Sequence, residues 1–229
     1  MKLKAIHNWD VTIEEAKAIQ LQLAPKVLAK GGPSIKDINF IAGCDVAFDI
    51  KNKIAYGSLV LMSYPDLEIL STISGEASLR FPYIPGFLTF REMEVLLKLF
   101  KKLEIIPDVV LADGQGIAHP RGIGLASHLG LFLDIPTIGC AKSRLVGTWE
   151  EVGPNKGDNS PLIYKSKEIG KVLRTRDNVK PIFVSPGHLI SIENASRIAL
   201  SATTKYRIPE PTRQADKMVA KYKNEVLCD

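Results

Sequence analysis

The sequence of 229 residues lacks the patterns that mark membrane, secreted and zinc-binding proteins. No apolar run approaches the length of a membrane span, and the segment Met1 to Ala5 lacks the apolar core of a signal peptide. The three cysteines, Cys44, Cys140 and Cys228, lie far apart and form no CxxC pair. Their odd number and their spacing favour reduced thiols over disulfides or a zinc site. We therefore expect a cytoplasmic protein that does not interact with a membrane.

Several common enzyme motifs are also missing. No segment resembles a Ser-His-Asp nucleophile elbow, a P-loop, a dinucleotide fingerprint or an HExxH zinc helix. The four histidines are widely spaced, which disfavours a histidine-based metal site. The formal net charge of +5 fits a protein that binds a polyanion, although many lysine-rich enzymes are equally basic.

The order of strand-like and helix-like segments predicts an α/β fold, in which helices flank a mixed β-sheet. With 45% hydrophobic residues the chain can bury a substantial core, and we expect one domain over residues 1–229. Three antiparallel strands are expected first, followed by strands that alternate with helices. The predicted strands are Asn39–Phe48, Ala55–Tyr64, Leu67–Glu76, Val109–Ala112, Ile135–Ala141, Leu162–Lys165, Ile169–Thr175 and Pro181–Val184.

Helices are predicted from their caps and from the spacing of their apolar residues. The first begins at a capping box formed by Thr12 and Glu15, and ends near Pro25. Two more span Thr89 to Leu103 and Leu125 to Leu133. Another is expected to begin at Ser185, as its cap, with Pro186 at its first position. A last short helix with a fraying, lysine-bearing tail is predicted after the segment Pro209–Pro211.

The most informative segment is the strand that ends at Asp113, together with the glycine-punctuated loop that follows. This loop carries His119 and Arg121, and it ends at Gly124. A carboxylate at a strand end beside a flexible cationic loop can hold a hard metal ion against a phosphate. The alternative is that Asp113 only caps the turn before Gly114.

Three further acids are candidates for the same chemistry. Asp45 lies inside an apolar strand, where an ionised group must be paired, neutral or metal-bound unless it turns outward to water. Glu92 follows Thr89 at capping-box spacing, so its alternative role is to satisfy a helix N-terminus. Asp216, taken alone, has the character of an ordinary surface acid. Carboxylates that converge from separate elements would hold Mg²⁺, and Lys142 would neutralise phosphate charge unless it is merely a solvated lysine.

Six motifs, which run in order along the chain from Gly43 to Asp216, together closely resemble the endonuclease V family. The motifs are Gly43-Cys44-Asp45-Val46-Ala47-Phe48, Pro82 to Glu92, Asp113-Gly114-Gln115-Gly116 with His119-Pro120-Arg121, Lys142-Ser143-Arg144-Leu145, Ser185-Pro186-Gly187-His188 and Pro209-Glu210-Pro211-Thr212-Arg213. The resemblance implies a ribonuclease-H-like fold and a Mg²⁺-dependent DNA repair endonuclease, with Mn²⁺ as a substitute. Such an enzyme recognises deoxyinosine and hydrolyses the second phosphodiester bond 3′ to the lesion, leaving 3′-hydroxyl and 5′-phosphate ends.

The resemblance also assigns roles to individual residues. Asp45 and Asp113 become the principal metal ligands, Glu92 the third acid, and Lys142 the basic residue near the scissile phosphate. Asp216 falls where the family has a further acid or a histidine near the metals, so a role specific to histidine does not transfer. The implied contacts to the lesion or to DNA are Pro82, Tyr83, Ile84, Pro85, Gly86, Gly116, His119, Gly124, Leu145 and Ser185.

Tyr83 is the residue expected to insert at the lesion and separate the strands. Because it stands between two prolines in a stiff loop, it can replace a lost stacking partner at low entropic cost. The alternative is that Tyr83 is a core aromatic beneath a loop. The expected partner is inosine-containing DNA, double- or single-stranded, bound by a monomer. Two other functions stay open: an endoribonuclease specific for inosine in RNA, and a lesion-binding module without catalysis.

Overall fold

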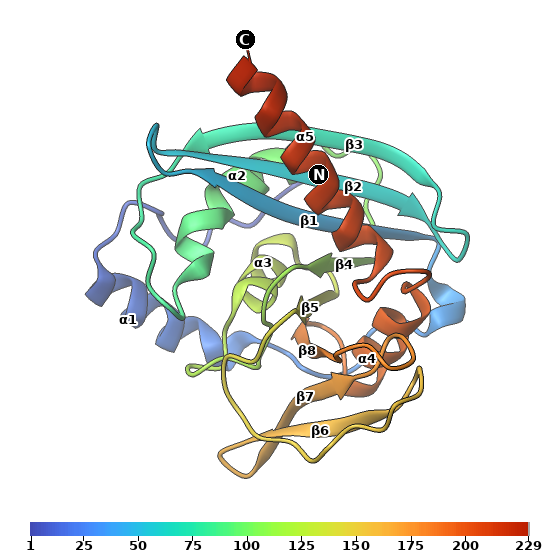
Figure 1. The fold of residues 1–229 in the computed structure, drawn as a ribbon. Coiled ribbons are helices and arrows are strands. Elements are labelled where there is room, and N and C mark those ends of the chain that lie inside the picture. Colours follow the sequence, from blue (N-terminus) through green and yellow to red (C-terminus); the bar gives the residue numbers. More distant parts are fainter. Residues whose placement is uncertain (229) are drawn as a thin grey trace.

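An eight-stranded mixed β-sheet crosses the computed structural model, which describes residues 1–228 (Figure 1). The strands lie in the order β3-β2-β1-β4-β5-β8-β7-β6. They span β1 (Phe40–Asp49), β2 (Ile54–Ser63), β3 (Ile69–Ser78), β4 (Val109–Ala112), β5 (Thr137–Ala141), β6 (Asn159–Tyr164), β7 (Lys167–Leu173) and β8 (Ile182–His188). As predicted, β1, β2 and β3 form an antiparallel meander. Strands β1, β4 and β5 run parallel, so the sheet is mixed.

Helices cover both faces of this sheet. The clusters of buried apolar residues place α2 (Leu88–Lys102) and α3 (Leu125–Leu133) on one face, and α4 (Ile192–Ser201) and α5 (Glu210–Cys228) on the other. Helix α1 (Ile13–Leu23) begins with the predicted capping box, in which Thr12 and Glu15 bind each other's backbone N–H groups. Two short 3₁₀ helices, η1 (Ala24–Lys26) and η2 (Ile35–Asp37), follow it.

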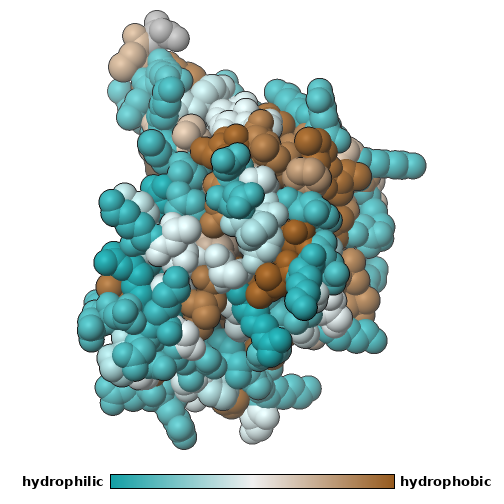
Figure 2. All heavy atoms as spheres, turned by 90° about the vertical axis from the view of Figure 1, so that its right-hand side faces the viewer, coloured by the Kyte–Doolittle hydropathy of each residue, from teal (hydrophilic) through white to brown (hydrophobic). Residues whose placement is uncertain are grey.

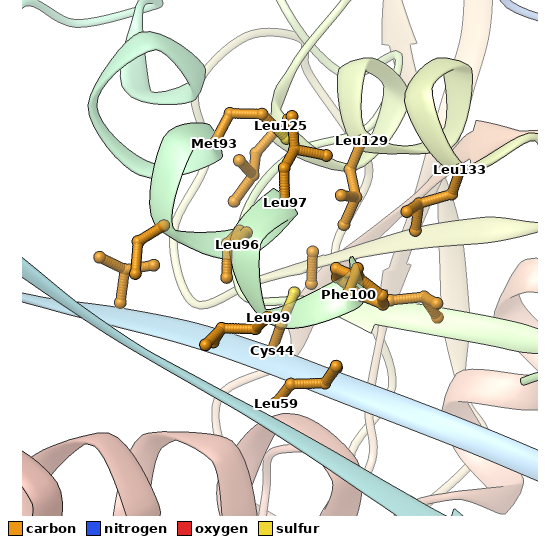
Figure 3. Packing of buried hydrophobic residues seen from close by; sticks show 14 of the residues in the cluster. Cys44, Leu59, Met93, Leu96, Leu97, Leu99, Phe100, Leu125, Leu129 and Leu133 are labelled. Carbon is orange, nitrogen blue, oxygen red and sulfur yellow. The ribbon is translucent and has the colours of Figure 1, made fainter. Parts of the chain in front are cut away.

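The alternation of β1 decides which side chains enter which layer of the core. Cys44 faces the α2 and α3 layer, where side chains such as Leu96 and Leu99 lie above it and above Leu59 of β2 (Figure 3). Burial of each large apolar side chain there contributes about 1.5–3 kcal/mol. Because successive strand residues point to opposite faces, Asp45 is directed to the other side of the sheet, toward α5.

The predicted helix beginning at Ser185 is wrong. Ser185 and Pro186 belong to β8, where they pair with Gly139 and Ile138 of β5. The β5–β8 pairing is irregular at this point, which accommodates a proline without an N–H group. Helix α4 begins six residues after Pro186, and its cap is Ser191, whose hydroxyl accepts a hydrogen bond from the Asn194 N–H.

The prediction of a short final helix with a fraying tail is also wrong. Helix α5 has 19 residues and packs across β1 and β2. Its buried residues Ala215 and Val219 repeat at helical spacing, and the ring of Tyr222 lies 6.0 Å from that of Tyr56 on β2. Lys223 donates a hydrogen bond to the Phe48 carbonyl at 2.7 Å, so a lysine that we assigned to the tail holds the helix on the sheet.

The surface turned toward the viewer in Figure 2, which is the right-hand side of Figure 1, is mainly hydrophilic, with hydrophobic side chains gathered in its upper part. Among the helices of residues 1–228, none has both the length and the apolar character that a membrane span requires.

Candidate active site

Asp45 and Asp113 lie side by side because their strands are parallel neighbours. The register of β1 and β4 pairs Cys44 with Ala112, the residues immediately before the two acids. Lys142, which follows β5, donates to Asp113 Oδ2 at 2.5 Å. Within residues 1–228 no backbone N–H donates to the Asp113 carboxylate, so turn capping does not account for its position.

Asp45 is partly buried and does not face open water, so the outward-facing alternative is wrong. Burial raises its pKa to about 7, with further contributions from the negative charges of Asp113 and Asp216. Lys142 opposes this shift only in part, because its ammonium group lies closest to Asp113. The acids of the site therefore carry more negative charge than Lys142 balances.

Glu92 adds a third carboxylate from α2. The cap residue of this helix is Phe87, and no side chain forms a capping hydrogen bond there, so the capping alternative for Glu92 is wrong. The side chain is only 7% exposed. Burial raises the pKa of Glu92, and Asp45 and Asp113 raise it further. Glu92 thus lies within electrostatic range of both aspartates.

Asp216 reaches the site through close packing of α5 on β1. A Cβ atom at Gly43 would lie 2.1 Å from the carbonyl carbon of Pro211, so only glycine allows this approach. Asp216 itself is exposed, yet its charge raises the pKa values of Asp45 and Lys142. Asp216, which has the character of an ordinary surface acid in the sequence, therefore lies at the edge of the cluster of acids formed by Asp45, Glu92 and Asp113.

The donor chemistry of this group fits a hard divalent cation. Within residues 1–228, no three Asp, Glu, His or Cys side chains are already arranged as a metal-ligand set. However, carboxylate oxygens are the ligands that Mg²⁺ prefers, and a cation would relieve the repulsion that raises the pKa of Asp45. Asp45 and Asp113 follow paired residues of adjacent parallel strands, so their carboxylates come from neighbouring points of the sheet edge. The residues therefore fit a metal centre by their chemistry and their placement.

A cavity of about 330 Å³ opens beside Asp113, which is the one acid of the four in its lining. Three segments contribute to its walls: the loop Pro82–Gly86, which we call the wedge loop, the loop Gly114–Gly124, which we call the glycine loop, and the segment after β5. Pro82 itself, a predicted lesion contact, does not line this cavity. Tyr83 lines this cavity and is 72% exposed, so the core-aromatic alternative is wrong. The cavity wall includes Tyr83, Ile84, Pro85, Gly86, Asp113, His119, Gly124, Lys142 and Leu145, which are nine of the predicted site residues.

The carbonyl oxygen of Gly86 joins the wedge loop to the glycine loop. It accepts hydrogen bonds from His119 Nε2 at 2.9 Å, Arg121 Nη2 at 2.7 Å and Gln20 Nε2 at 3.0 Å. Burial lowers the pKa of His119 to about 4, so its imidazole is neutral at neutral pH. Since Nε2 donates to Gly86, Nδ1 carries the lone pair that accepts from the Arg121 N–H.

Two residues predicted to contact the lesion lie beneath the cavity wall. Ser185 is fully buried, and its hydroxyl accepts a hydrogen bond from the Gly116 N–H at 2.8 Å. A Cβ atom at Gly116 would lie 1.9 Å from the Pro186 carbonyl oxygen, so this glycine allows the loop to approach β8 closely. The structure shows both residues supporting the glycine loop from behind, and their contact with the lesion stays a prediction.

Gln115 is a cavity residue that we did not single out from the sequence. Its side-chain Nε2 donates to the Ser143 carbonyl at 3.0 Å, which leaves Oε1 buried and without a partner among residues 1–228. Its position between Gly114 and Gly116 could have identified it as a functional candidate. A polar side chain is not needed there to form the loop. Gln20 was also missed, since its local pattern is that of an ordinary helix residue.

Comparison with known proteins agrees with this geometry. The Endonuclease V family model matches residues 21–217. The relative named Endonuclease V from Rippkaea orientalis is 47% identical and aligns over 99% of this chain and 98% of its own length. That from Nostoc punctiforme is 45% identical, over 96% of this chain and 99% of its own length.

Solved structures extend the agreement to three dimensions. The Streptomyces avermitilis Endonuclease V superposes with a TM-score of 0.91 at 36% identity, covering 99% of this chain and 100% of that one. The Ciona intestinalis Endonuclease V, solved with a 24mer DNA containing an inosine followed by a ribo-adenosine, has a TM-score of 0.83 at 30% identity, with 93% and 98% coverage. These matches confirm the predicted ribonuclease-H-like α/β fold. Sequence and structure agree over nearly the whole length, and the chain belongs to the endonuclease V family.

Proposed function

We propose that this chain, as one catalytic domain, nicks DNA at the second phosphodiester bond 3′ to a deoxyinosine and leaves 3′-hydroxyl and 5′-phosphate ends. The observation that carries the proposal is the approach of Asp45, Asp113 and Glu92 beside a cavity that bears the exposed ring of Tyr83. The Ciona relative, whose structure holds inosine-containing DNA, supports the choice of substrate.

Asp45 and Asp113 would hold Mg²⁺, or Mn²⁺ in its place, with Glu92 as the third acid and Asp216 at the edge of the site. When bound, the ion lowers the pKa of a coordinated water and stabilises the negative charge on the phosphate. The protein holds two carboxylates at the ends of adjacent strands and adds a third, buried acid from α2.

Lys142 has two states in this proposal. Without substrate its ammonium group is paired with Asp113. Its side chain is 49% exposed, so it can turn toward a phosphate as Asp113 turns toward a cation. The raised pKa of Lys142, which its acidic neighbours maintain despite partial burial, keeps the group protonated for that contact.

Base recognition is assigned to the cavity. Removal of a base from the stack costs a few kcal/mol, and less for an inosine that is already mispaired. Tyr83 would occupy the space that the base leaves. Hypoxanthine carries an N1–H donor where adenine carries an acceptor, so the unpartnered Oε1 of Gln115 would accept from hypoxanthine and repel adenine.

The test is cleavage of an end-labelled duplex with one deoxyinosine, in Mg²⁺ and in EDTA, beside the same duplex with deoxyadenosine. We expect a Mg²⁺-dependent nick at the second phosphodiester bond 3′ to the deoxyinosine. The control duplex, which has deoxyadenosine at the same position, should not be cleaved. Binding to the lesion without cleavage in Mg²⁺ or Mn²⁺ would overturn the catalytic assignment and favour a binding module.

Cleavage of inosine in RNA is the second candidate, because the DNA in the Ciona complex carries a ribo-adenosine after the inosine. The same site would act on either backbone. A matched single-inosine RNA belongs in the same assay, and cleavage confined to it would replace DNA repair with RNA cleavage.

A further inference from the structure

A second groove, which we call the basic groove, lies on the other side of the wedge loop. It has a volume of about 620 Å³, and its charged lining residues are Lys53, Arg80 and Arg91, with no carboxylate among them. Lys53 lies in the turn between β1 and β2, and Arg80 follows β3. Both segments lie at the left of the view in Figure 1, whereas α4 lies at the right.

The three cations of this groove have no ion-pair partners among the residues that the structure describes. Lys53 and Arg80 are exposed and extend the charge to the surface. A groove with several cations and no acid attracts a polyanion, for which phosphate groups are the natural ligands.

Arg91 is the most informative member of the group, because it is only 7% exposed. Its Nη1 donates to the Phe81 carbonyl at 3.0 Å, while Nε is buried without a partner. Its Cζ lies 4.5 Å from the centroid of the Phe48 ring and 5.8 Å from that of Tyr83. Burial raises the pKa of the nearby Glu92 and the charge of Arg91 acts to lower it, but the two side chains form no ion pair among residues 1–228. An anion in the groove would supply the missing partner and offset the cost of burying the guanidinium.

The wedge loop separates this groove from the active site. Tyr83, Ile84 and Pro85 line the cavity beside the carboxylates, whereas Phe81 and Pro82 line the basic groove. A strand that is cut at Asp113 must run on the cavity side. If Tyr83 enters a duplex at the lesion, the other strand is directed to the opposite side of the same loop.

We propose that the basic groove, through Lys53, Arg80 and Arg91, binds the phosphate backbone of the strand opposite the lesion. The inference rests on the proposed function, because it assumes that the cavity side holds the lesion strand. It assigns to these three residues a role in duplex substrates that single-stranded substrates do not require.

The experiment compares the double variant Lys53→Gln/Arg80→Gln with the wild type on the same deoxyinosine oligonucleotide, alone and in a duplex. Glutamine removes the charge and keeps a long polar side chain at two exposed positions. Lys36→Gln/Arg197→Gln is the matched control, because it removes one lysine and one arginine from another groove, formed by η2 and α4. Binding is measured by fluorescence anisotropy in EDTA at several salt concentrations, and cleavage under single-turnover conditions in Mg²⁺.

We expect the groove variant to bind the duplex several-fold more weakly, with a salt slope smaller by about two, and to retain single-strand binding and cleavage. The control variant should behave as the wild type on both substrates. Equal losses on the duplex and the single strand would overturn the inference, as would equal losses in the control variant. The variants Lys53→Gln and Arg80→Gln, each of which removes one charge, are compared in the same way. A wild type that does not cleave inosine DNA would instead refute the proposed function.

Discussion

The Nε2 atom of His119 lies 2.9 Å from the carbonyl oxygen of Gly86, and this hydrogen bond connects the two loops that enclose the cavity. The contact requires a proton on Nε2. Burial lowers the pKa of His119 to about 4, so the ring is neutral at neutral pH and its Nδ1 accepts a hydrogen bond from the Arg121 N–H. A side chain of the glycine loop therefore holds the wedge loop in position.

His119 makes stability dependent on pH in a defined window. Its pKa is about 4 in the folded protein and about 6.5 in the unfolded chain, so between these values the unfolded chain binds the additional proton. The contribution of the neutral imidazole is complete above pH 6.5 and is lost as the pH falls toward 4, by up to about 3 kcal/mol. Urea unfolding at pH 7 and pH 5 should show a larger drop for the wild type than for His119→Gln, which keeps a donor without titrating. Equal drops would show that His119 does not carry the effect.

Asp45→Asn should stabilise the metal-free protein while abolishing cleavage. The pKa of Asp45 is raised to about 7 in the fold, so its ionised form destabilises the fold increasingly above the unfolded value near 4. At pH 8 in EDTA, we expect the variant to be more stable by about 2 kcal/mol, after allowance for partial solvent exposure. Mg²⁺ should stabilise the wild type and not the variant. Asp134→Asn, at an exposed helix end, serves as the control, and cleavage by Asp45→Asn at the wild-type rate would remove Asp45 from the metal site.

Tyr83→Ala should reduce the preference for inosine over adenine more than it reduces the rate of metal-dependent hydrolysis. The side chain is 72% exposed, so its removal should change the free energy of unfolding by less than about 0.5 kcal/mol. Tyr83→Phe retains the ring and should keep the preference. The ratio of kcat/KM values for inosine and adenine substrates provides the measurement, and an unchanged ratio in Tyr83→Ala would contradict insertion of the ring.

Gln115→Leu removes the unpartnered acceptor from the cavity. Loss of a hydrogen bond to a buried polar group costs about 1–3 kcal/mol, so kcat/KM for deoxyinosine should fall about tenfold or more. Methylation at N1 of hypoxanthine removes the same hydrogen bond from the substrate side. The variant should therefore distinguish the methylated base from deoxyinosine less well than the wild type does. Full discrimination in Gln115→Leu would place N1 recognition elsewhere.

Gly43→Ala should separate α5 from β1, because the added Cβ would lie 2.1 Å from the Pro211 carbonyl carbon. We expect a loss of about 3 kcal/mol in stability and a larger fall in activity, since Asp216 moves with the helix. Gly75→Ala in β3 is the matched control, because its Cβ would meet only the Leu99 side chain at 3.1 Å. Chemical denaturation and the inosine cleavage assay measure the two effects.

Local patterns in the sequence determined much of the fold. The capping box at Thr12 and Glu15, the antiparallel β1–β3 meander and the α3 bounds all follow from interactions between residues close in the chain. The family motifs indicated Asp45, Glu92 and Asp113 because these acids are themselves part of the motifs. In each case the information lies within one short segment.

Only the tertiary structure decided the features that depend on pairing between distant segments. Ser185 has the local character of a helix cap, but pairing of β8 with β5 holds it in a strand and places its hydroxyl on Gly116. Asp216 joins the acids because Gly43 admits α5 onto β1. Gln115 Nε2 binds the Ser143 carbonyl, 28 residues away in the chain, and among residues 1–228 its Oε1 has no partner. Periodicity and capping report which residues face a core, whereas sheet register and helix docking decide which of them meet there.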